Sequence, residues 1–96
     1  MPRQEALNLP TFNVNGISYV PLISICQQKN INWDYDSFLR KISLKKQNTE
    51  INLIVGSHVF LVNGNLMNLT RPVEFYKGII VVPYEFYQKT QRYFEV

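Results

Sequence analysis

The side chains that could carry out chemistry are few in this chain of 96 residues. His58 is the only histidine, so a metal centre built from several histidines has no ligands here. A Ser-His-Asp triad would depend on this one histidine, and no serine lies in a Gly-x-Ser-x-Gly turn. The glycine-rich phosphate-binding loops of nucleotide enzymes are also missing from the sequence. We therefore predict no catalytic residue, no metal site and no cofactor.

Cys26 is the only cysteine, which excludes an internal disulfide. It lies among Leu22, Ile23 and Ile25, and this surrounding favours a small buried apolar side chain over a reactive thiol. His58 belongs to an alternating segment, where we expect it to be at the surface or half-buried.

Two carboxylates, Asp34 and Asp36, flank Tyr35. In a strand both would face the same side, and paired carboxylates can act as general acid and base on a glycosidic bond. A turn is the other interpretation, because aspartate hydrogen-bonds nearby backbone groups in turns. We favour the turn, and the acid–base pair is the alternative.

Aromatic residues crowd the C-terminal quarter of the chain. Four tyrosines there, Tyr76, Tyr84, Tyr87 and Tyr93, are candidates for contact with a ligand or a partner protein. A tyrosine can offer its apolar face to a sugar ring or to another protein while its hydroxyl stays in water. The same rings could instead fill a small core, and this is the interpretation that we favour.

The net charge of +3 is modest, and its basic residues gather only at Arg40, Lys41, Lys45 and Lys46. We expect these to lie on a solvated strand that the lysines protect from edge pairing. A nucleic-acid binder would carry a stronger basic stripe, so we predict no nucleic-acid partner. No apolar run reaches the length of about 20 residues that spans a bilayer, and residues 1–10 form a polar lead-in without a signal-peptide core. We predict no membrane insertion.

A motif that occurs twice marks the elements that position these residues. The first copy runs from Gly16 to Val20-Pro21 and the second from Gly78 to Val82-Pro83. In each copy the glycine favours a turn with positive φ, β-branched residues favour a strand, and the proline favours the start of a helix. We predict helices over residues 21–29 and 83–91, with a closing strand beginning near Tyr93.

Between these helices the apolar residues alternate as they do in strands. The alternating segments are residues 41–45, 51–55 and 58–62, separated by turn signals at residues 46–49, Gly56-Ser57 and Asn63-Gly64. Asn63-Gly64 is typical of a type I′ hairpin. We predict an α+β fold, in which an antiparallel β-meander packs with two short helices.

The ordered set of motifs resembles the copper amine oxidase N-terminal-like domain. The similarity covers the chain from about Phe12 onward, which predicts a single domain over residues 11–96. We expect the residues at its motif positions to have a structural role. They are Gly16, Val20, Pro21, Trp33, Asp34, Gly56, Asn63, Gly64, Gly78, Val82 and Pro83.

The resemblance implies a non-catalytic accessory module of a bacterial cell-envelope or secreted protein, such as an N-acetylmuramoyl-L-alanine amidase. Such a module would position or anchor its neighbouring domain by contacts with peptidoglycan or protein. It would not bind copper, because the histidine ligands of the oxidase have no counterpart here. The alternative is a protein-interaction or self-association domain that uses an open sheet edge or the aromatic C-terminal surface.

Overall fold

The computed structural model describes residues 10–94, and its larger sheet is an antiparallel meander of consecutive strands. Alternate residues of this sheet point inward, and the inward set includes Ile42, Leu44, Ile51, Leu53 and Phe60, which are all buried. The strands are β3 (Asn32–Asp36), β4 (Lys41–Lys46), β5 (Thr49–Ile54), β6 (Val59–Val62) and β7 (Asn65–Asn68). The predicted meander is confirmed, with one further strand on each side of the three expected from alternation.

The repeated motif forms a second sheet, which the sequence did not separate from the meander. Its order is β1-β2-β9-β8. Each copy of the motif is a hairpin followed by a helix: β1 (Phe12–Val14), β2 (Ile17–Pro21) and α1 (Leu22–Lys29) in the first, and β8 (Glu74–Tyr76), β9 (Ile79–Pro83) and α2 (Tyr84–Phe94) in the second.

The two copies meet through their central strands. β2 pairs with β9 in antiparallel register, and Val20 lies directly opposite Val82. Because these valines hold the same position in the two copies of the motif, the copies are related by an approximate two-fold axis between them. The hairpin turns match as well, with positive φ at Asn15-Gly16 (54° and 83°) and at Lys77-Gly78 (52° and 86°). Such angles suit type I′ turns, in which the strand twist is preserved.

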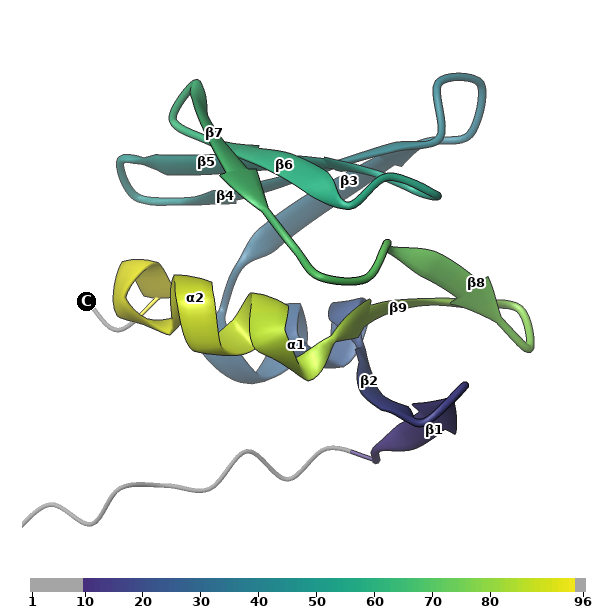
Figure 1. The fold of residues 1–96 in the computed structure, drawn as a ribbon. Coiled ribbons are helices and arrows are strands. Elements are labelled where there is room, and N and C mark those ends of the chain that lie inside the picture. The colour runs from purple at the N-terminus through teal and green to yellow at the C-terminus, as the bar shows by residue number, and fades with distance from the viewer. Residues whose placement is uncertain (1–9, 95–96) are drawn as a thin grey trace, which may run out of the picture.

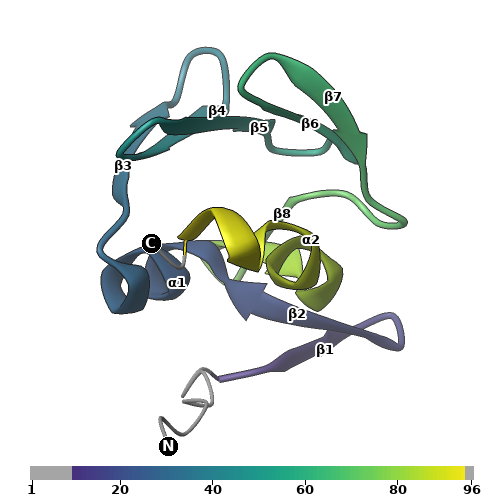
Figure 2. The same cartoon turned by 90° about the vertical axis from the view of Figure 1, so that its left-hand side faces the viewer.

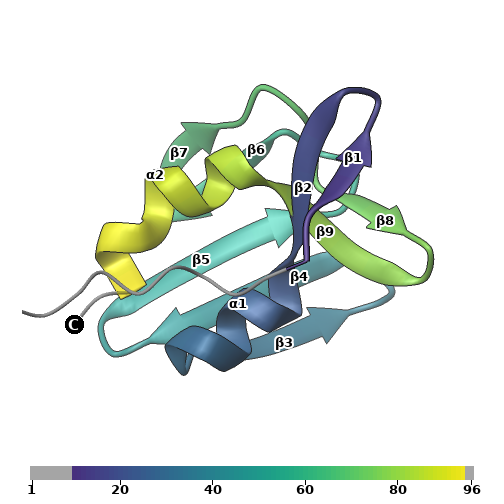
Figure 3. The ribbon, with the colours of Figure 1, turned by 90° about the horizontal axis from the view of Figure 1, so that it is seen from below.

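The five-stranded sheet forms one layer, and the two helices and the four-stranded sheet lie together on one side of it. Figure 1 shows α1 and α2 below the five-stranded sheet, with β8 and β9 beside them at about their level and β2 and β1 further down. Figures 2 and 3 place α1 beneath the β3 side of the larger sheet and α2 beneath the β7 side. The core fills this interior, where the buried rings of Phe60 and Phe86 meet edge to face with centroids 5.1 Å apart. The α+β class is thereby confirmed.

Both helices end at one lysine. Lys46 Nζ donates hydrogen bonds to the carbonyl oxygens of Lys29, the last residue of α1, and Phe94, the last of α2, each at 2.6 Å. A cation is stabilising there, because the carbonyl groups at a helix C-terminus carry partial negative charge. α1 also ends as predicted beside Lys29, with Asn30 in the left-handed conformation (φ 56°, ψ 48°).

Four local predictions were wrong. The basic residues of β4 do not protect an edge, because β4 lies between β3 and β5. α2 continues to Phe94, so Tyr93 begins no strand; the helix continues because Phe94 is buried in the core. Pro21 and Pro83 end strands, and the helices begin one residue later. Asp34 lies inside β3 rather than in a turn, because alternation sends Trp33 and Tyr35 to the inner face. The turn interpretation holds for Asp36 alone, whose Oδ1 accepts bonds from the N–H groups of residues 38 and 39 at 2.9 and 3.1 Å.

Candidate functional site

The four tyrosines proposed as contacts do not gather at one place. Tyr87 is buried in the core, while Tyr84 is 40% exposed with its ring centroid 5.9 Å from that of Tyr87. Tyr76 lies on β8 against Phe12, with centroids 5.3 Å apart. Tyr93 packs partly against the core at the far end of α2, where Arg92 lies over its ring. These positions form no common surface for a ligand.

Other aromatic residues do form one. A groove of about 570 Å³ lies between the edge strand β3 and the repeated hairpin–helix units. Trp33 and Tyr35 line it from β3, and Phe12 and Phe75 line it from β1 and β8. We call this site the aromatic groove. Its remaining walls are mostly apolar and consist of Pro10, Pro21, Ile23, Ser24, Gly78, Ile79 and Ile80.

The aromatic groove is open to water. Trp33 is 46% exposed and Phe75 is 44% exposed, although both are large apolar side chains. Tyr35 joins the two sides, because its ring meets that of Phe75 edge to face with centroids 6.0 Å apart. Exposed apolar surface gathered in a groove marks an interaction site more often than scattered apolar residues do.

The outer side of β3 is polar. Asn32, Asp34 and Asp36 point away from the groove, since they alternate with Trp33 and Tyr35. A hollow of about 290 Å³ beside them also contains Ser43, Lys45 and Glu50. Trp33 lines both this hollow and the aromatic groove. One strand therefore carries an aromatic face and an acidic face.

β3 also has an open backbone edge. Within residues 10–94, β3 pairs only with β4 and stands at the end of the five-stranded sheet. Alternate N–H and C=O groups along its other side are consequently available to another strand. The aromatic groove lies directly along this edge, because Trp33 and Tyr35 belong to both.

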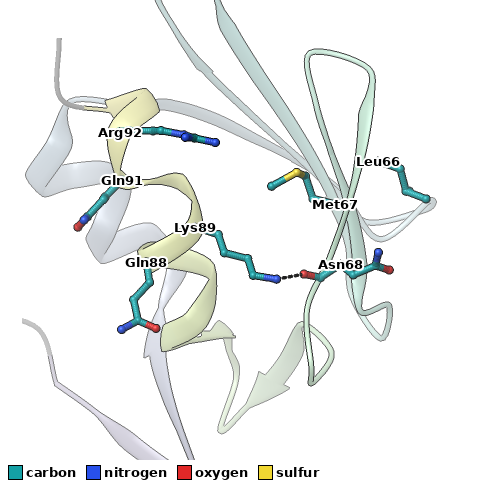
Figure 4. Close-up of a pocket in the computed structure, with 7 residues that line it drawn as sticks. All are labelled: Leu66, Met67, Asn68, Gln88, Lys89, Gln91 and Arg92. Atoms are coloured by element: carbon teal, nitrogen blue, oxygen red, sulfur yellow. Dashed lines mark hydrogen bonds between the residues drawn. The ribbon is translucent and has the colours of Figure 1, made fainter.

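The opposite end of the sheet contains a second groove, of about 590 Å³, between β7 and α2 (Figure 4). Figure 4 shows Lys89 reaching from α2 to β7, where its Nζ donates to the carbonyl oxygen of Asn68 at 2.7 Å. Met67 points toward the helix and Leu66 points away from it. Lys89 also pairs with Glu85 at 3.1 Å. This groove is crossed by contacts within the domain.

Next to this second groove, Glu85 in the first turn of α2 links the helix to the segment that follows β7. Its carboxylate accepts a hydrogen bond from the Thr70 N–H at 2.8 Å, in addition to its pair with Lys89. Partial burial raises the pKa of Glu85, but the hydrogen bonds from Thr70 and Lys89 outweigh it, so the pKa lies below its ordinary value of 4.5. The ionised carboxylate is therefore part of the folded structure.

The chemically capable residues stay apart. Cys26 is buried on α1, and burial raises the pKa of its thiol to about 12, which leaves it protonated at neutral pH. His58 is exposed beside β6, as expected for a surface position. Among residues 10–94, no group of three His, Cys, Asp or Glu side chains lies close enough to hold a metal ion.

Sequence reasoning missed most of the aromatic groove. It assigned Trp33 to a structural motif and did not single out Tyr35, Phe12 or Phe75 as contacts. The alternation of Trp33 and Tyr35 with Asn32, Asp34 and Asp36 was the available signal, because it is typical of a strand with one apolar face. No local signal could bring Phe12 and Phe75 to that strand, since they come from the other sheet.

The described residues form an α+β domain with an open apolar groove. The chain matches the model of the copper amine oxidase N-terminal domain over residues 3–93, and it belongs to that family. The match is to the accessory domain and not to the catalytic part of those oxidases. A search of curated proteins finds no match to the chain. Neither helix within residues 10–94 has the length and apolar character needed to cross a membrane.

Proposed function

We propose that this domain is a non-catalytic accessory module that holds its parent protein in place by binding a partner in the aromatic groove. The observation that carries the proposal is the position of the groove, which runs along the open edge of β3. An extended segment of another protein can use both features at once: its backbone pairs with the edge strand and its alternate side chains enter the groove.

The composition of the groove favours a protein partner. Its walls are aromatic and aliphatic, and the polar side-chain groups among the residues that line it are the Ser24 and Tyr35 hydroxyls and the Trp33 indole N–H. Apolar side chains are retained in such a groove by removal of apolar surface from water, at about 25 cal/mol per Å². The large exposed rings of Trp33 and Phe75 are suited to contribute most of this energy.

A cell-wall glycan is the second candidate, and one observation favours it. The Trp33 ring lies between the aromatic groove and the polar hollow that contains Asp34, Ser43 and Glu50. A sugar stacks on an aromatic face while its hydroxyl groups hydrogen-bond polar side chains, so this arrangement suits a sugar chain. The parent protein we propose is a bacterial envelope or secreted enzyme, such as an N-acetylmuramoyl-L-alanine amidase.

Sedimentation with purified Gram-positive cell walls tests the proposal and separates the two partners. The walls are used before and after protease treatment, which removes wall-bound proteins and leaves the glycan. We expect the domain to sediment with untreated walls and to lose this binding after proteolysis. Binding that survives proteolysis would assign the groove to the glycan instead.

Variants show whether the groove is the contact surface. We expect Trp33→Ala and Phe75→Ala each to weaken binding about tenfold or more, as hot-spot aromatic residues do. Leu66→Ala is the matched control, because Leu66 is an exposed apolar residue (64%) at the other end of the sheet. Equal binding of all three variants, or no binding by the wild-type domain, would rule out the groove as the site.

A further inference from the structure

The acidic face of β3 restricts what can pair with its edge. Asp34 and Asp36 both point to the outer side of the sheet, and both are exposed. The only ion pair within 4.0 Å among residues 10–94 joins Lys89 and Glu85, so neither aspartate is neutralised by a close cation. A strand added beside β3 would place its own outward side chains next to these charges.

A second copy of this chain is a poor occupant of the edge. In the antiparallel register that pairs all five residues of β3 with β3 of another copy, Asp34 lies opposite Asp34 and Asp36 lies opposite Asn32. Like charges directly opposite each other destabilise a strand pair. The charges therefore oppose extension of the sheet by self-pairing, which is a known protection of edge strands.

The strand that already pairs with β3 shows the complementary pattern. On the outer side, Lys41 lies opposite Asp36 and Lys45 lies opposite Asn32, with Ser43 opposite Asp34. On the inner side, β4 contributes the buried apolar residues Ile42 and Leu44. β3 is thus paired on one edge with a strand that is basic or polar outside and apolar inside.

A strand added at the open edge of β3 would need the same alternation of apolar inward and basic outward side chains. Trp33 and Tyr35 face inward, where the aromatic groove continues to Phe75 and Ile79. The inward residues of an added strand would lie over this groove, so apolar side chains are favoured there. Its outward residues would lie beside Asp34 and Asp36, so lysine or arginine is favoured there.

We infer that the natural ligand of the aromatic groove is an extended protein segment in which basic and apolar residues alternate. It adds to β3 as a sixth strand of the larger sheet, with its basic residues beside Asp34 and Asp36 and its apolar residues over Trp33. This inference rests on the proposed function of the groove and adds to it the chemistry and conformation of the partner.

A capped peptide with the sequence of β4, Lys-Ile-Ser-Leu-Lys-Lys, is a suitable probe because β4 already satisfies one edge of β3. The domain is titrated with millimolar peptide and followed by amide chemical shifts and by the indole signal of Trp33, the only tryptophan. We expect the changes to concentrate at residues 32–36 and at Phe75. Changes confined to other strands, or none, would overturn the inference.

Charge reversal tests the specificity. The control peptide Glu-Ile-Ser-Leu-Glu-Glu keeps the apolar residues, and we expect it to bind wild-type protein about three- to tenfold more weakly than the basic peptide. The variant Asp34→Lys should abolish this preference, because the introduced ammonium group offsets the remaining charge of Asp36. Asp34 is exposed in the middle of β3 and so is not needed for the core. Asp34→Asn should give intermediate affinity for both peptides.

The outcomes separate this inference from the proposed function. Equal affinity for the two peptides, with binding still lost in Trp33→Ala, would leave the groove as the contact surface and overturn the charge rule alone. Binding of both peptides that is insensitive to Trp33→Ala would count against the groove itself. Retention of the domain on protease-treated walls, combined with no peptide binding, would replace the protein segment with a glycan.

Discussion

At the β7 end of the five-stranded sheet, Lys89 crosses from α2 and occupies the carbonyl group of Asn68. At the β3 end, no hydrogen bond within residues 10–94 reaches the backbone of Asn32–Asp36 from any element other than β4. Each end lies over one helix of the repeated motif, α1 beneath β3 and α2 beneath β7 (Figures 2 and 3). Both β3 and β7 are edge strands, but a side chain from a helix caps the last residue of β7, whereas exposed aromatic residues line the edge at β3.

The largest expected effect contrasts two aromatic pairs. Phe86 is fully buried against Phe60, whereas Phe75 meets Tyr35 in the open groove. We expect Phe86→Ala to lower the free energy of unfolding by about 3–4 kcal/mol. Phe75→Ala should lower it by about 1 kcal/mol or less, because its ring is 44% exposed in the folded state. Urea denaturation measures both; equal losses would mean that the groove aromatics serve stability and would remove the contrast.

A second test concerns the lysine that both helices share. Lys46 donates one hydrogen bond to the C-terminal end of each helix, so it contributes equally to α1, beneath β3, and to α2, beneath β7 (Figure 2). Lys46→Met should lower the free energy of unfolding by about 2 kcal/mol, since it leaves two carbonyl groups without their charged donor. Lys45→Met is the control and should change it by less than about 0.5 kcal/mol, because Lys45 is exposed. A similar loss in both variants would show that general charge, and not the shared contact, is responsible.

The third test removes contacts between α2 and the segment that follows β7. Glu85→Gln weakens the contacts to Thr70 and Lys89, and we expect it to lower the free energy of unfolding by about 1 kcal/mol at pH 7. The folded pKa of Glu85 lies below its unfolded value, so its contribution is complete above the ordinary value of 4.5 and disappears as the pH falls through the folded value. Thermal unfolding of the two proteins should therefore converge in acid. A difference that is constant with pH would contradict the ionised role of Glu85.

The smallest expected effect concerns the rate at which the Cys26 thiol reacts with a thiol reagent. Cys26 lies on α1, beneath the β3 side, and its buried thiol has a pKa of about 12. We expect Cys26 in the folded domain to be unreactive toward a thiol reagent at pH 8, and to react rapidly in denaturant. Trp33→Ala should leave the folded rate unchanged, because the groove is open without any movement of α1. Rapid reaction in the folded wild-type domain would mean that α1 moves away from the core often enough to expose the thiol.

The sequence predicted the parts of the fold that depend on local spacing. The alternation of residues 41–45, 51–55 and 58–62 predicted three strands of the meander, and the Pro21 and Pro83 motifs predicted where both helices begin to within one residue. Tyr93 was misplaced because the burial of Phe94, which extends α2, depends on tertiary packing. Asp34 was misplaced because turn preference is a local property, whereas its strand is set by pairing with β4.

The candidate site was much less predictable. The abundance of aromatic residues near the C-terminus suggested Tyr76, Tyr84, Tyr87 and Tyr93 as contacts. Abundance does not show whether a ring lies in the core or at the surface. The groove is formed by strands from both sheets, and its acidic and aromatic faces alternate along β3 alone. The pairing of β2 with β9 brings the strands of Phe12 and Phe75 into one sheet, and packing of that sheet beside the larger one brings both rings to the groove that Trp33 lines.

The pairing of Val20 with Val82 has a consequence for the order of folding. The hairpins of the larger sheet join neighbouring segments and can form early, whereas β2 must wait until almost the whole chain has been assembled before β9 can reach it. The aromatic groove needs lining from both sheets, so it is completed with this last, long-range closure. A partner that occupies the groove therefore binds the folded domain, and by mass action it shifts the equilibrium away from the unfolded state.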